Sequence, residues 1–195
     1  MKLTIIGASG HGKVCADIAE KIGYNEIEFL DDDISLQTCG KWPVVGCVEK
    51  ANYIQNDLFV AIGNSDIRKK LMNRNCVTLI HPNAVVADDT QIGDGTVVMA
   101  GAVINPGAKI GRGVIVNTSS SIDHDCVVGD FVHVSVGAHL SGTVTVGEGT
   151  WIAVGASIAN NVSICSSCTV GAGAVVIKDI NESGTYVGVP ARKIR

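Results

Sequence analysis

Three of the five histidines in this 195-residue sequence fall within sixteen residues, and they are its best candidates for proton transfer. His124 directly precedes Asp125, His133 follows nine residues after His124, and His139 six residues after that. An imidazole beside a carboxylate is a general-base arrangement, because the acid fixes the tautomer and stabilises the imidazolium ion. We therefore expect His124 and Asp125 to form a catalytic pair.

A glycine-rich segment near the N-terminus predicts a nucleotide site. Residues 7–12 (GASGHG) carry glycine at the first, fourth and sixth positions, and they follow an apolar segment and precede an amphipathic one. Backbone N–H groups at such a helix start bind phosphate. Asp31 and Asp32 lie about twenty residues on, where a ribose-binding acid belongs. The alternative is a turn that needs glycine only for tight strand–helix packing. A nucleophile elbow is excluded, because G-x-S-x-G would need glycine where His11 stands.

The residues around this turn predict a small parallel α/β sheet. One helix carries Val14, Ile18 and Ile22 on one face and ends before Gly23, and a second follows Gly63. The expected strands are 2–6, 26–30, 58–62 and 76–80, and the second helix carries Ile67 and Leu71. Residues 34–57 give no clear prediction. Eighty residues provide only half of a dinucleotide fold, so we expect a Rossmann-like domain over 1–82 rather than a full NAD enzyme.

The rest of the chain is dominated by a strict six-residue repeat. Sixteen aliphatic residues recur from Val86 to Val176 without an insertion, and a small or β-branched residue stands two positions before most of them. Alternation along a strand places both residues on the inner side. A period of six fits neither a helix nor a flat strand. It predicts a β-solenoid over 83–195 in which each hexad forms one short strand and one corner.

A second period of eighteen residues predicts a triangular cross-section. It is marked by four glycines that each follow an aliphatic position, namely Gly93, Gly111, Gly129 and Gly147. Three hexads then close one coil, and sixteen hexads make about five coils. We expect these glycines to serve corners that need unusual backbone angles.

Composition excludes several classes of function. A net charge of −4 without a basic run argues against a nucleic-acid surface. Residues 1–6 lead directly into the glycine turn, so we expect no signal peptide, and no apolar stretch is long enough for a membrane span. Of seven cysteines, Cys126 and Cys168 occupy inward positions, and Cys165 and Cys168 form the sole C-x-x-C. We expect buried structural thiols in a reducing cytoplasm.

The repeat also places the histidines. His124 falls between inward positions 122 and 126, at a corner, and projects outward, whereas His133 and His139 precede aliphatic positions on adjacent faces. A single prism cannot easily gather the three around one point, but neighbouring subunits could. A zinc site is an alternative, although the spacings do not resemble the carbonic anhydrases built on such coils. Surface histidines without a role are another. We expect no metal.

Several segments of the sequence resemble those of a known protein family. The hexads resemble the left-handed parallel β-helix of acyl-CoA-dependent acyltransferases, and residues 188–192 (GVPAR) resemble their closing segment. The segments that narrow the resemblance are 7–12, 30–32 (LDD), 61–64 (AIGN), 122–125 (IDHD) and 133–138 (HVSVGA). Together they resemble the sugar-nucleotide acetyltransferases of the bacillosamine pathway (PglD-like), with sialic-acid O-acetyltransferases (NeuD-like) as a related branch. The likeness spans essentially the whole chain.

This resemblance implies a cytoplasmic homotrimer with active sites between neighbouring subunits. The α/β domain would bind a UDP-sugar, and acetyl-CoA would lie along the coil as co-substrate. The UDP-sugar contacts would be Ser9, Gly10, His11, Asp31, Asp32 and Gly63. The first three would meet the phosphates, the two acids the uridine end, and the glycine the same pocket.

The acetyl-CoA contacts implied by the resemblance are His133, Gly142, Val154 and Ala172. The first two would lie at the thioester, and the other two farther along the coil. Relatives have Glu where Asp125 stands and Gly where Ala172 stands. The shorter acid would then reach His124 through a bridging water, and the extra methyl would tighten the pantetheine path.

The expected reaction is acetyl transfer to the 4-amino group of a UDP-linked 4-amino-4,6-dideoxy sugar. His124 would remove a proton, and backbone N–H groups near His133 would stabilise the oxyanion. One alternative is an O-acetyltransferase acting on a sialic acid or another sugar hydroxyl. A second, of another class, is a non-catalytic solenoid scaffold, which should show a regular polar ladder that this sequence lacks. The nucleotide base, the exact sugar and the acyl length stay open.

Overall fold

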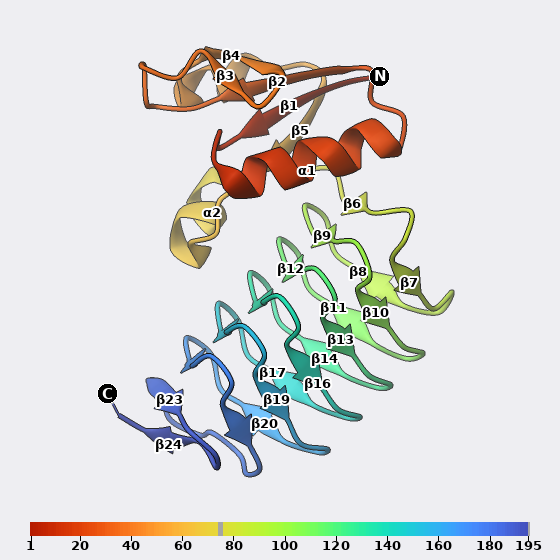
Figure 1. The fold of residues 1–195 in the computed structure, drawn as a ribbon, viewed down its shortest axis with the longest axis vertical. Helices are drawn as coiled ribbons and strands as arrows, with labels where there is room; N and C mark the ends of the chain where they lie inside the picture. Colours follow the sequence, from red (N-terminus) through yellow and green to blue (C-terminus); the bar gives the residue numbers. More distant parts are fainter. Residues whose placement is uncertain (74–75, 195) are drawn as a thin grey trace.

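The structure is a computed structural model that describes residues 1–73 and 76–194. It is mostly β: a small α/β unit with two α-helices stands at one end of a parallel β-solenoid, and the chain runs from that unit along the solenoid (Figure 1). None of the described helices is long and apolar enough to cross a membrane.

The α/β unit is built around one five-stranded sheet. Its strands are β1 (Lys2–Ile6), β2 (Glu26–Leu30), β3 (Thr38–Cys39), β4 (Trp42–Gly46) and β5 (Asp57–Val60), in the order β3-β4-β2-β1-β5. Strands β4, β2, β1 and β5 are parallel, and β3 pairs antiparallel with β4. The helices are α1 (Gly10–Lys21), the 3₁₀ helix η1 (Val48–Tyr53) and α2 (Ser65–Leu71). The predicted alternation of strands and helices is confirmed, and β4 completes the sheet from the segment without a prediction.

The fourth strand predicted for this sheet was wrong. Only Leu79–Ile80 forms a strand, β6, and it pairs with β9 (Val97–Val98) of the solenoid. The reason is register: Ile80 lies six residues before Val86 and packs against the solenoid core. The repeat therefore begins one hexad earlier than the prediction.

The solenoid has three faces, which we number in the order in which the chain reaches them. Face 1 contains β6, β9, β12 (Ile115–Val116), β15 (His133–Val134), β18 (Trp151–Ile152), β21 (Thr169–Val170), β23 (Thr185–Val187) and β24 (Arg192–Lys193). Face 2 contains β7 (Val85–Val86), β10 (Val103–Ile104), β13 (Ser121–Ile122), β16 (His139–Leu140), β19 (Ser157–Ile158) and β22 (Val175–Val176). Face 3 contains β8 (Gln91–Ile92), β11 (Lys109–Ile110), β14 (Val127–Val128), β17 (Thr145–Val146) and β20 (Ser163–Ile164).

The inward pattern read from the sequence is confirmed. From β6 to β22, strands of one face pair in parallel at an interval of eighteen residues, for example Val103 with Ser121 and Ile115 with His133, whereas β23 and β24 close face 1 as an antiparallel pair. The aliphatic and small positions form one continuous buried core from Val98 to Val176. Small inward residues let the three faces meet closely, which is why the solenoid needs almost no aromatic side chains.

The four glycines spaced eighteen residues apart have a different role from the one predicted. None of them has a positive φ; a Cβ added at Gly93 would lie 2.6 Å from the Arg112 backbone nitrogen, so they permit close stacking of coils. The left-handed corner conformation falls instead at every sixth residue from 95 to 173. Six of those positions carry a side chain, and Asp125 (φ 58°) is one of them. Asp tolerates this conformation better than most residues do.

Helix α1 connects the two parts of the molecule. Its buried residues are Gly12, Cys15, Ala16, Ile18 and Ala19, so the predicted apolar face was wrong at Val14, which is 41% exposed. These residues share one core cluster with outward residues of face 1, including Val97, Met99 and Ile115. Burying each such side chain contributes roughly 1.5–3 kcal/mol. Face 1 is therefore the side of the solenoid to which the α/β unit is fixed.

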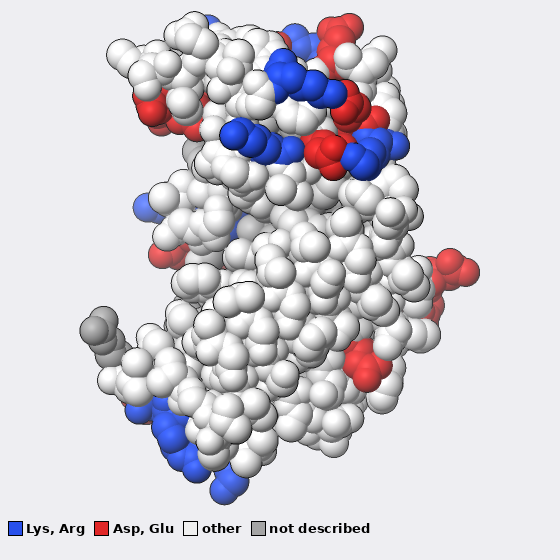
Figure 2. All heavy atoms as spheres, in the orientation of Figure 1, with Lys and Arg blue, Asp and Glu red and all other residues white. Residues whose placement is uncertain are grey.

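The distribution of cysteines and charges agrees in part with the predictions. Cys126 and Cys168 are buried in the core, but Cys47 is exposed and Cys165 is half-buried, 3.4 Å from the Cys168 sulfur. Charged side chains gather on the α/β unit and at the C-terminal end, whereas the solenoid surface in view carries very few (Figure 2).

Candidate active site

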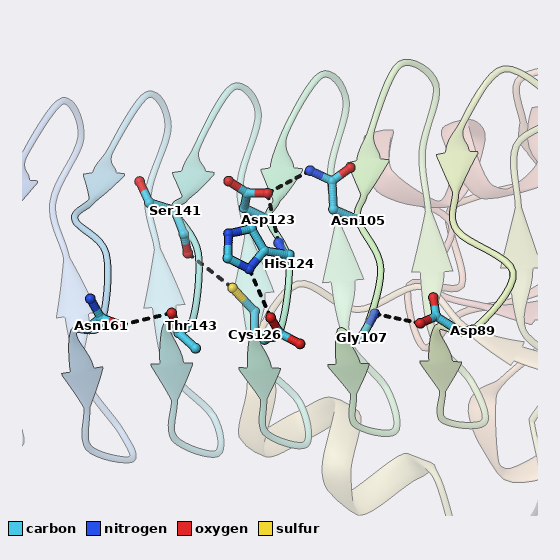
Figure 3. Close-up of polar contacts among 10 residues, drawn as sticks. Asp89, Asn105, Gly107, Asp123, His124, Cys126, Ser141, Thr143 and Asn161 are labelled. Atoms are coloured by element: carbon cyan, nitrogen blue, oxygen red, sulfur yellow. Dashed lines mark hydrogen bonds and ion pairs between the residues drawn. The ribbon is translucent and has the colours of Figure 1, made fainter.

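The His124–Asp125 pair lies at the corner between β13 on face 2 and β14 on face 3, which we call corner 2/3 (Figure 3). The His124 Nδ1 is 2.9 Å from the Asp125 Oδ2, so the contact is direct, and the bridging water expected for the shorter acid is not needed. Both side chains are more than half exposed. The left-handed backbone at Asp125 turns its carboxylate back onto the preceding imidazole.

Asp123 and Gly142 also lie next to His124. Asp123 accepts hydrogen bonds from the His124 backbone N–H at 2.8 Å and from the Asn105 side chain at 2.7 Å. Gly142 lies against the ring, and a Cβ there would come within 2.5 Å of the His124 Nε2. At corner 2/3 the His124 Nδ1 is therefore hydrogen-bonded to Asp125, and the Nε2 faces Gly142, which has no side chain.

Electrostatics make His124 a stronger base than an isolated imidazole. The hydrogen bond that His124 donates to Asp125 raises the pKa of His124 above its usual value, and the negative charges of Asp123 and Asp125 act in the same direction. In the neutral ring, Nδ1–H donates to Asp125 and Nε2 keeps a lone pair. The geometry therefore supports proton acceptance at Nε2.

A pocket of about 440 Å³ lies elsewhere, between the start of α2 and face 1. Gly63, Asn64 and Ser65 line one side of it, and the solenoid side includes Phe131, His133, Trp151 and Thr169. The His133 and Trp151 rings stack with centroids 6.3 Å apart and an interplanar angle of 18°. In this cavity the α/β unit presents polar groups and the solenoid presents polar and aromatic groups.

Two neutral histidines belong to this region. Burial, followed by the positive charge of Arg68, lowers the pKa of His11 to about 4. Burial, with Arg68 and then His11 as further causes, lowers the pKa of His133 to about 4. His11 comes from the glycine turn and His133 from face 1, so the structure brings together two predicted site residues that are far apart in sequence. Both are uncharged at neutral pH.

The tautomer of His133 follows from its partner. The Asn117 Oδ1 accepts the Thr118 backbone N–H at 2.8 Å, so the Asn117 Nδ2 is the atom that faces the His133 Nε2, 3.1 Å away. An amide nitrogen can only donate, and the His133 Nε2 must therefore accept. The proton is then on Nδ1. His133 and the neutral form of His124 thus both have the proton on Nδ1, but the His133 Nε2 accepts from Asn117.

The glycine turn divides into packing positions and one open position. Gly7 has φ +104°, and a Cβ on Gly12 would collide with the Gly7 carbonyl and the Phe29 ring. Both glycines are thus explained by close packing, which was the alternative interpretation of the motif. Gly10 has open space where a Cβ would stand, and Ser9 caps α1 without a side-chain hydrogen bond. The start of α1 remains the candidate anion site.

The acidic side chains that follow β2 accept hydrogen bonds from the protein backbone. The Asp31 Oδ2 accepts the Ala8 N–H at 2.7 Å, and its Oδ1 accepts the Asp33 N–H at 3.0 Å. The Asp32 Oδ1 accepts the Val48 N–H at 2.9 Å. Asp31 therefore shapes the glycine turn itself, a contact that the spacing of the motif did not reveal.

The four predicted acetyl-CoA residues lie on different parts of the solenoid. Gly142 is at corner 2/3 beneath His124, and His133 is on face 1. Val154 and Ala172 are exposed at the corner between faces 1 and 2, which we call corner 1/2. The oxyanion prediction was wrong for the groups nearest His133, since the N–H groups of His133 and Ser135 already donate to the Thr150 and Ile152 carbonyls.

One residue of this region was missed by the sequence reading. The predicted second helix carries Ile67 and Leu71, but in α2 Ile67 is 48% exposed and the buried side chain is Arg68, at 1%. The run Arg-Lys-Lys gave no indication which of its charges is buried. Only the position of α2 against the solenoid decides this.

The two histidine sites are separated within one chain. A three-sided prism has one corner opposite each face, and corner 2/3 is opposite face 1, where the α/β unit and the pocket lie. One chain therefore does not bring His124 to the pocket that contains His133. Among the described residues, no cluster of three or more His, Cys, Asp or Glu is arranged to hold a metal.

The hexapeptide-repeat solenoid is the architecture of a class of bacterial transferases. The profile of bacterial transferase hexapeptide repeats matches residues 76–106, and the profile of the PglD N-terminal domain matches residues 2–75. The acetyltransferase domain of PglB from Neisseria gonorrhoeae, in complex with acetyl coenzyme A, is 42% identical with a TM-score of 0.95, covering 99% of this chain and 98% of that chain. The chain belongs to the PglD-like family of hexapeptide-repeat sugar N-acetyltransferases.

Two further relatives indicate the chemistry of the family. Perosamine N-acetyltransferase from Caulobacter crescentus, solved with CoA and GDP-perosamine, is 35% identical with a TM-score of 0.93, covering 100% of this chain and 97% of that chain. UDP-N-acetylbacillosamine N-acetyltransferase of Bacillus subtilis (strain 168) is 39% identical over 110 residues, which are 50% of this chain and 51% of the relative. The chain thus spans about half the length of the curated relatives it matches.

Proposed function

We propose that this protein is an acetyl-CoA-dependent N-acetyltransferase that acts on the 4-amino group of a UDP-linked 4-amino-4,6-dideoxy sugar. The observation that carries the proposal is the His124–Asp125 pair at corner 2/3, with Nδ1 bonded to the carboxylate and Nε2 free above Gly142. The family relationship and the substrates in the relatives' names support the choice of an amino sugar.

In the proposed reaction, His124 acts as the general base. The Asp125 carboxylate holds the Nδ1 proton, and Nε2 accepts a proton from the sugar amine as its nitrogen attacks the thioester carbonyl. The C–S bond then breaks, and CoA leaves with the proton returned to its sulfur. A positioned base typically contributes about 10²–10⁴-fold to the rate. Holding the two substrates in line supplies much of the remainder.

The nucleotide end of the substrate is assigned to the α/β unit. The start of α1, with the open position at Gly10, would receive the diphosphate, and His11 adds a neutral side chain to the same region. Gly63 and His133 line the adjoining pocket, where the His133 Nδ1–H is available as a donor. We retain Ser9 as a phosphate contact and Asp32 as a uridine contact, and we reassign Asp31 to support of the turn.

The distance between pocket and base is accounted for by a site shared between two copies of the chain, as in the homotrimer expected from the family. Corner 2/3 of one copy would supply His124, and face 1 with corner 1/2 of the next would supply the pocket and the groove along Val154 and Ala172. The weakly charged solenoid surface in Figure 2 and the exposed Val136 and Val154 support such packing. We take the solenoid as a left-handed helix of about five coils beside a Rossmann-like unit, acting in the cytoplasm.

Mixing two inactive variants tests the shared site. His124→Ala removes the base, and Gly10→Glu places a carboxylate in the open space of the glycine turn, where it would repel a diphosphate. Co-expressed subunits should regain activity, because some sites then combine an intact corner with an intact pocket. Mixtures as inactive as either variant alone would contradict a site made from two copies.

The proposed reaction is tested by thiol release from acetyl-CoA against a panel of acceptors. The panel contains the UDP-linked 4-amino-4,6-dideoxy sugar, its GDP and dTDP counterparts, and free and CMP-linked sialic acid. Turnover confined to the UDP amino sugar is expected. Turnover only on a sialic acid would replace N-acetylation by O-acetylation, and no turnover on any acceptor would contradict the assignment.

A further inference from the structure

Arg68 is a fully buried cation that is held by backbone carbonyls. Its Nε donates to the Gly113 oxygen at 2.7 Å, and its Nη2 donates to the Phe131 oxygen at 2.7 Å. Its Nη1 donates to the Ile62 and Gly63 oxygens at 2.7 and 2.9 Å. Within residues 1–73 and 76–194, it forms no ion pair with a carboxylate. One guanidinium therefore connects three separate segments of the chain.

Gly63 and Phe131, two of the four residues whose carbonyls bind Arg68, line the pocket from opposite sides. The carbonyls of Ile62 and Gly63 belong to the turn between β5 and α2, which forms one wall. Phe131 belongs to the other wall, and Gly113 occupies the same corner of the solenoid one coil earlier. Asn64 stiffens the turn further, because its side chain accepts the Ile67 N–H at 3.0 Å. The hydrogen bonds of the Arg68 guanidinium thus fix the distance between the two walls of the pocket.

A purely stabilising role would not require a charge at this position. Removing a cation from water is costly, and burial indeed lowers the pKa of Arg68 to about 10, so that the side chain remains charged at neutral pH. Apolar residues of similar volume often stabilise such sites as well or better. What only arginine offers is a rigid, planar set of donors that can meet several carbonyls in fixed directions.

The neighbouring lysine provides a contrast within the same helix. Lys69 forms an ion pair with Glu148, and so it also joins α2 to the solenoid. That pair lies at the surface, where ion pairs contribute little and constrain the backbone weakly. Lys69 is thus a matched control for a link between the two parts that does not reach the pocket walls.

We propose that Arg68 is a positioning residue for the nucleotide-sugar site, which it forms by holding the β5–α2 turn at a fixed distance from the solenoid corner at Gly113 and Phe131. The kinetic part of this inference rests on the proposed function, whereas the structural part does not. Loss of the Arg68 guanidinium should let the β5–α2 turn move away from the solenoid. The pocket should then lose its shape while the rest of the fold persists.

The test compares Arg68→Met, Arg68→Lys and Lys69→Met with the wild type in two measurements. The first is hydrogen–deuterium exchange of peptides covering residues 60–73 and 110–135. The second is steady-state kinetics with the nucleotide sugar and acetyl-CoA varied in turn. Thermal unfolding confirms that each variant is folded, and Arg68→Lys keeps the charge should Arg68→Met fail to fold.

For Arg68→Met we expect the rate of hydrogen–deuterium exchange in the β5–α2 turn to rise about tenfold or more. A change of this size corresponds to the loss of one charge-assisted hydrogen bond. The KM for the nucleotide sugar should rise by a similar factor, with little change in the KM for acetyl-CoA. Arg68→Lys should show the same pattern, because one ammonium group cannot meet four carbonyls in fixed directions. Lys69→Met should match the wild type in both measurements.

Unchanged exchange in the turn of a folded Arg68 variant would overturn the proposal. A loss of kcat with both KM values unchanged would also overturn it, since that pattern indicates a smaller fraction of folded enzyme. If the wild type itself shows no turnover on the acceptor panel, the proposed function fails. The exchange measurement still decides whether Arg68 holds the walls of the pocket.

Discussion

Corner 2/3 and the pocket on face 1 each contain a histidine from the same short stretch of sequence, yet they give the two rings opposite properties. His124 is exposed, and Asp125 raises its pKa. His133 is enclosed beside Arg68 and His11, and its pKa is lowered to about 4. The first ring can take up a proton, and the second remains neutral and donates through Nδ1. Two histidines nine residues apart thus have pKa values shifted in opposite directions.

The comparison shows how surroundings override residue type. A carboxylate next to an exposed imidazole favours the charged form, whereas burial near a guanidinium disfavours it. Both effects are needed if one site is to contain a base and neutral donors at the same pH.

Removing the base should have the largest effect. His124→Ala should lower kcat by about 10²-fold or more with little change in either KM, because only the transition state uses the lost group. The measurement is steady-state kinetics with both substrates varied. His139→Ala is the control, since it removes an exposed imidazole from the adjacent face and should leave kcat within about twofold. A His124→Ala enzyme with wild-type turnover would contradict the assignment.

The two neutral histidines should make the protein less stable in acid. Their folded-state pKa values lie near 4, below the unfolded value of 6.5, so below pH 6.5 the unfolded chain binds protons that the folded chain does not. Stability is complete above pH 6.5 and is lost as the pH falls toward 4, by at most about 3 kcal/mol per histidine.

Urea unfolding at pH 7, 6 and 5 measures this loss. The stability advantage of the wild type over His11→Gln or His133→Gln should shrink as the pH falls, because the glutamine variants lack the titrating group. A difference that stays constant with pH for both variants would show that His11 and His133 are not held neutral by the fold.

Crowding the ring at corner 2/3 should have an intermediate effect. Gly142→Ala places a methyl group within 2.5 Å of the His124 Nε2, so the ring must move. Overpacking of this kind costs about 1–3 kcal/mol, and we expect kcat to fall by about tenfold. Thr143→Ala, at the next residue, should have a smaller effect. Equal kinetics for Gly142→Ala and the wild type would show that the ring is not positioned over this glycine.

Weakening the partner of the base should have the smallest effect. Asp125→Asn removes the charge that raises the pKa of His124, so the acid limb of the pH–kcat/KM profile should move to lower pH. The plateau rate should fall by about tenfold or less, because a weaker base accepts the proton less readily. Asp125→Glu should restore the position of the limb. An unmoved limb in Asp125→Asn would place the titrating group elsewhere.

The extent of sequence prediction differs between the two regions for a physical reason. Corner 2/3 was predicted in detail, because the hexad register alone places His124 outward at a turn and Asp125 beside it. The pocket was predicted only as a set of residues. Three of its features depend on segments that meet only in the folded chain. The Asp31 carboxylate accepts the Ala8 N–H, Gly7 and Gly12 allow close packing, and Arg68 is buried.

Sequence alone determined the solenoid, its three-sided section, its inward residues and the exposed position of His124. It could do so because each coil packs only on its neighbours, so that local periodicity contains nearly all the contacts that define the fold. Contacts between distant segments determine that strand 79–80 joins the solenoid, that Arg68 is the buried charge, and that the pKa values of His11 and His133 are lowered. Desolvation and charge–charge interactions act between residues that are distant in the chain, and no spacing of residue types records which of them will meet.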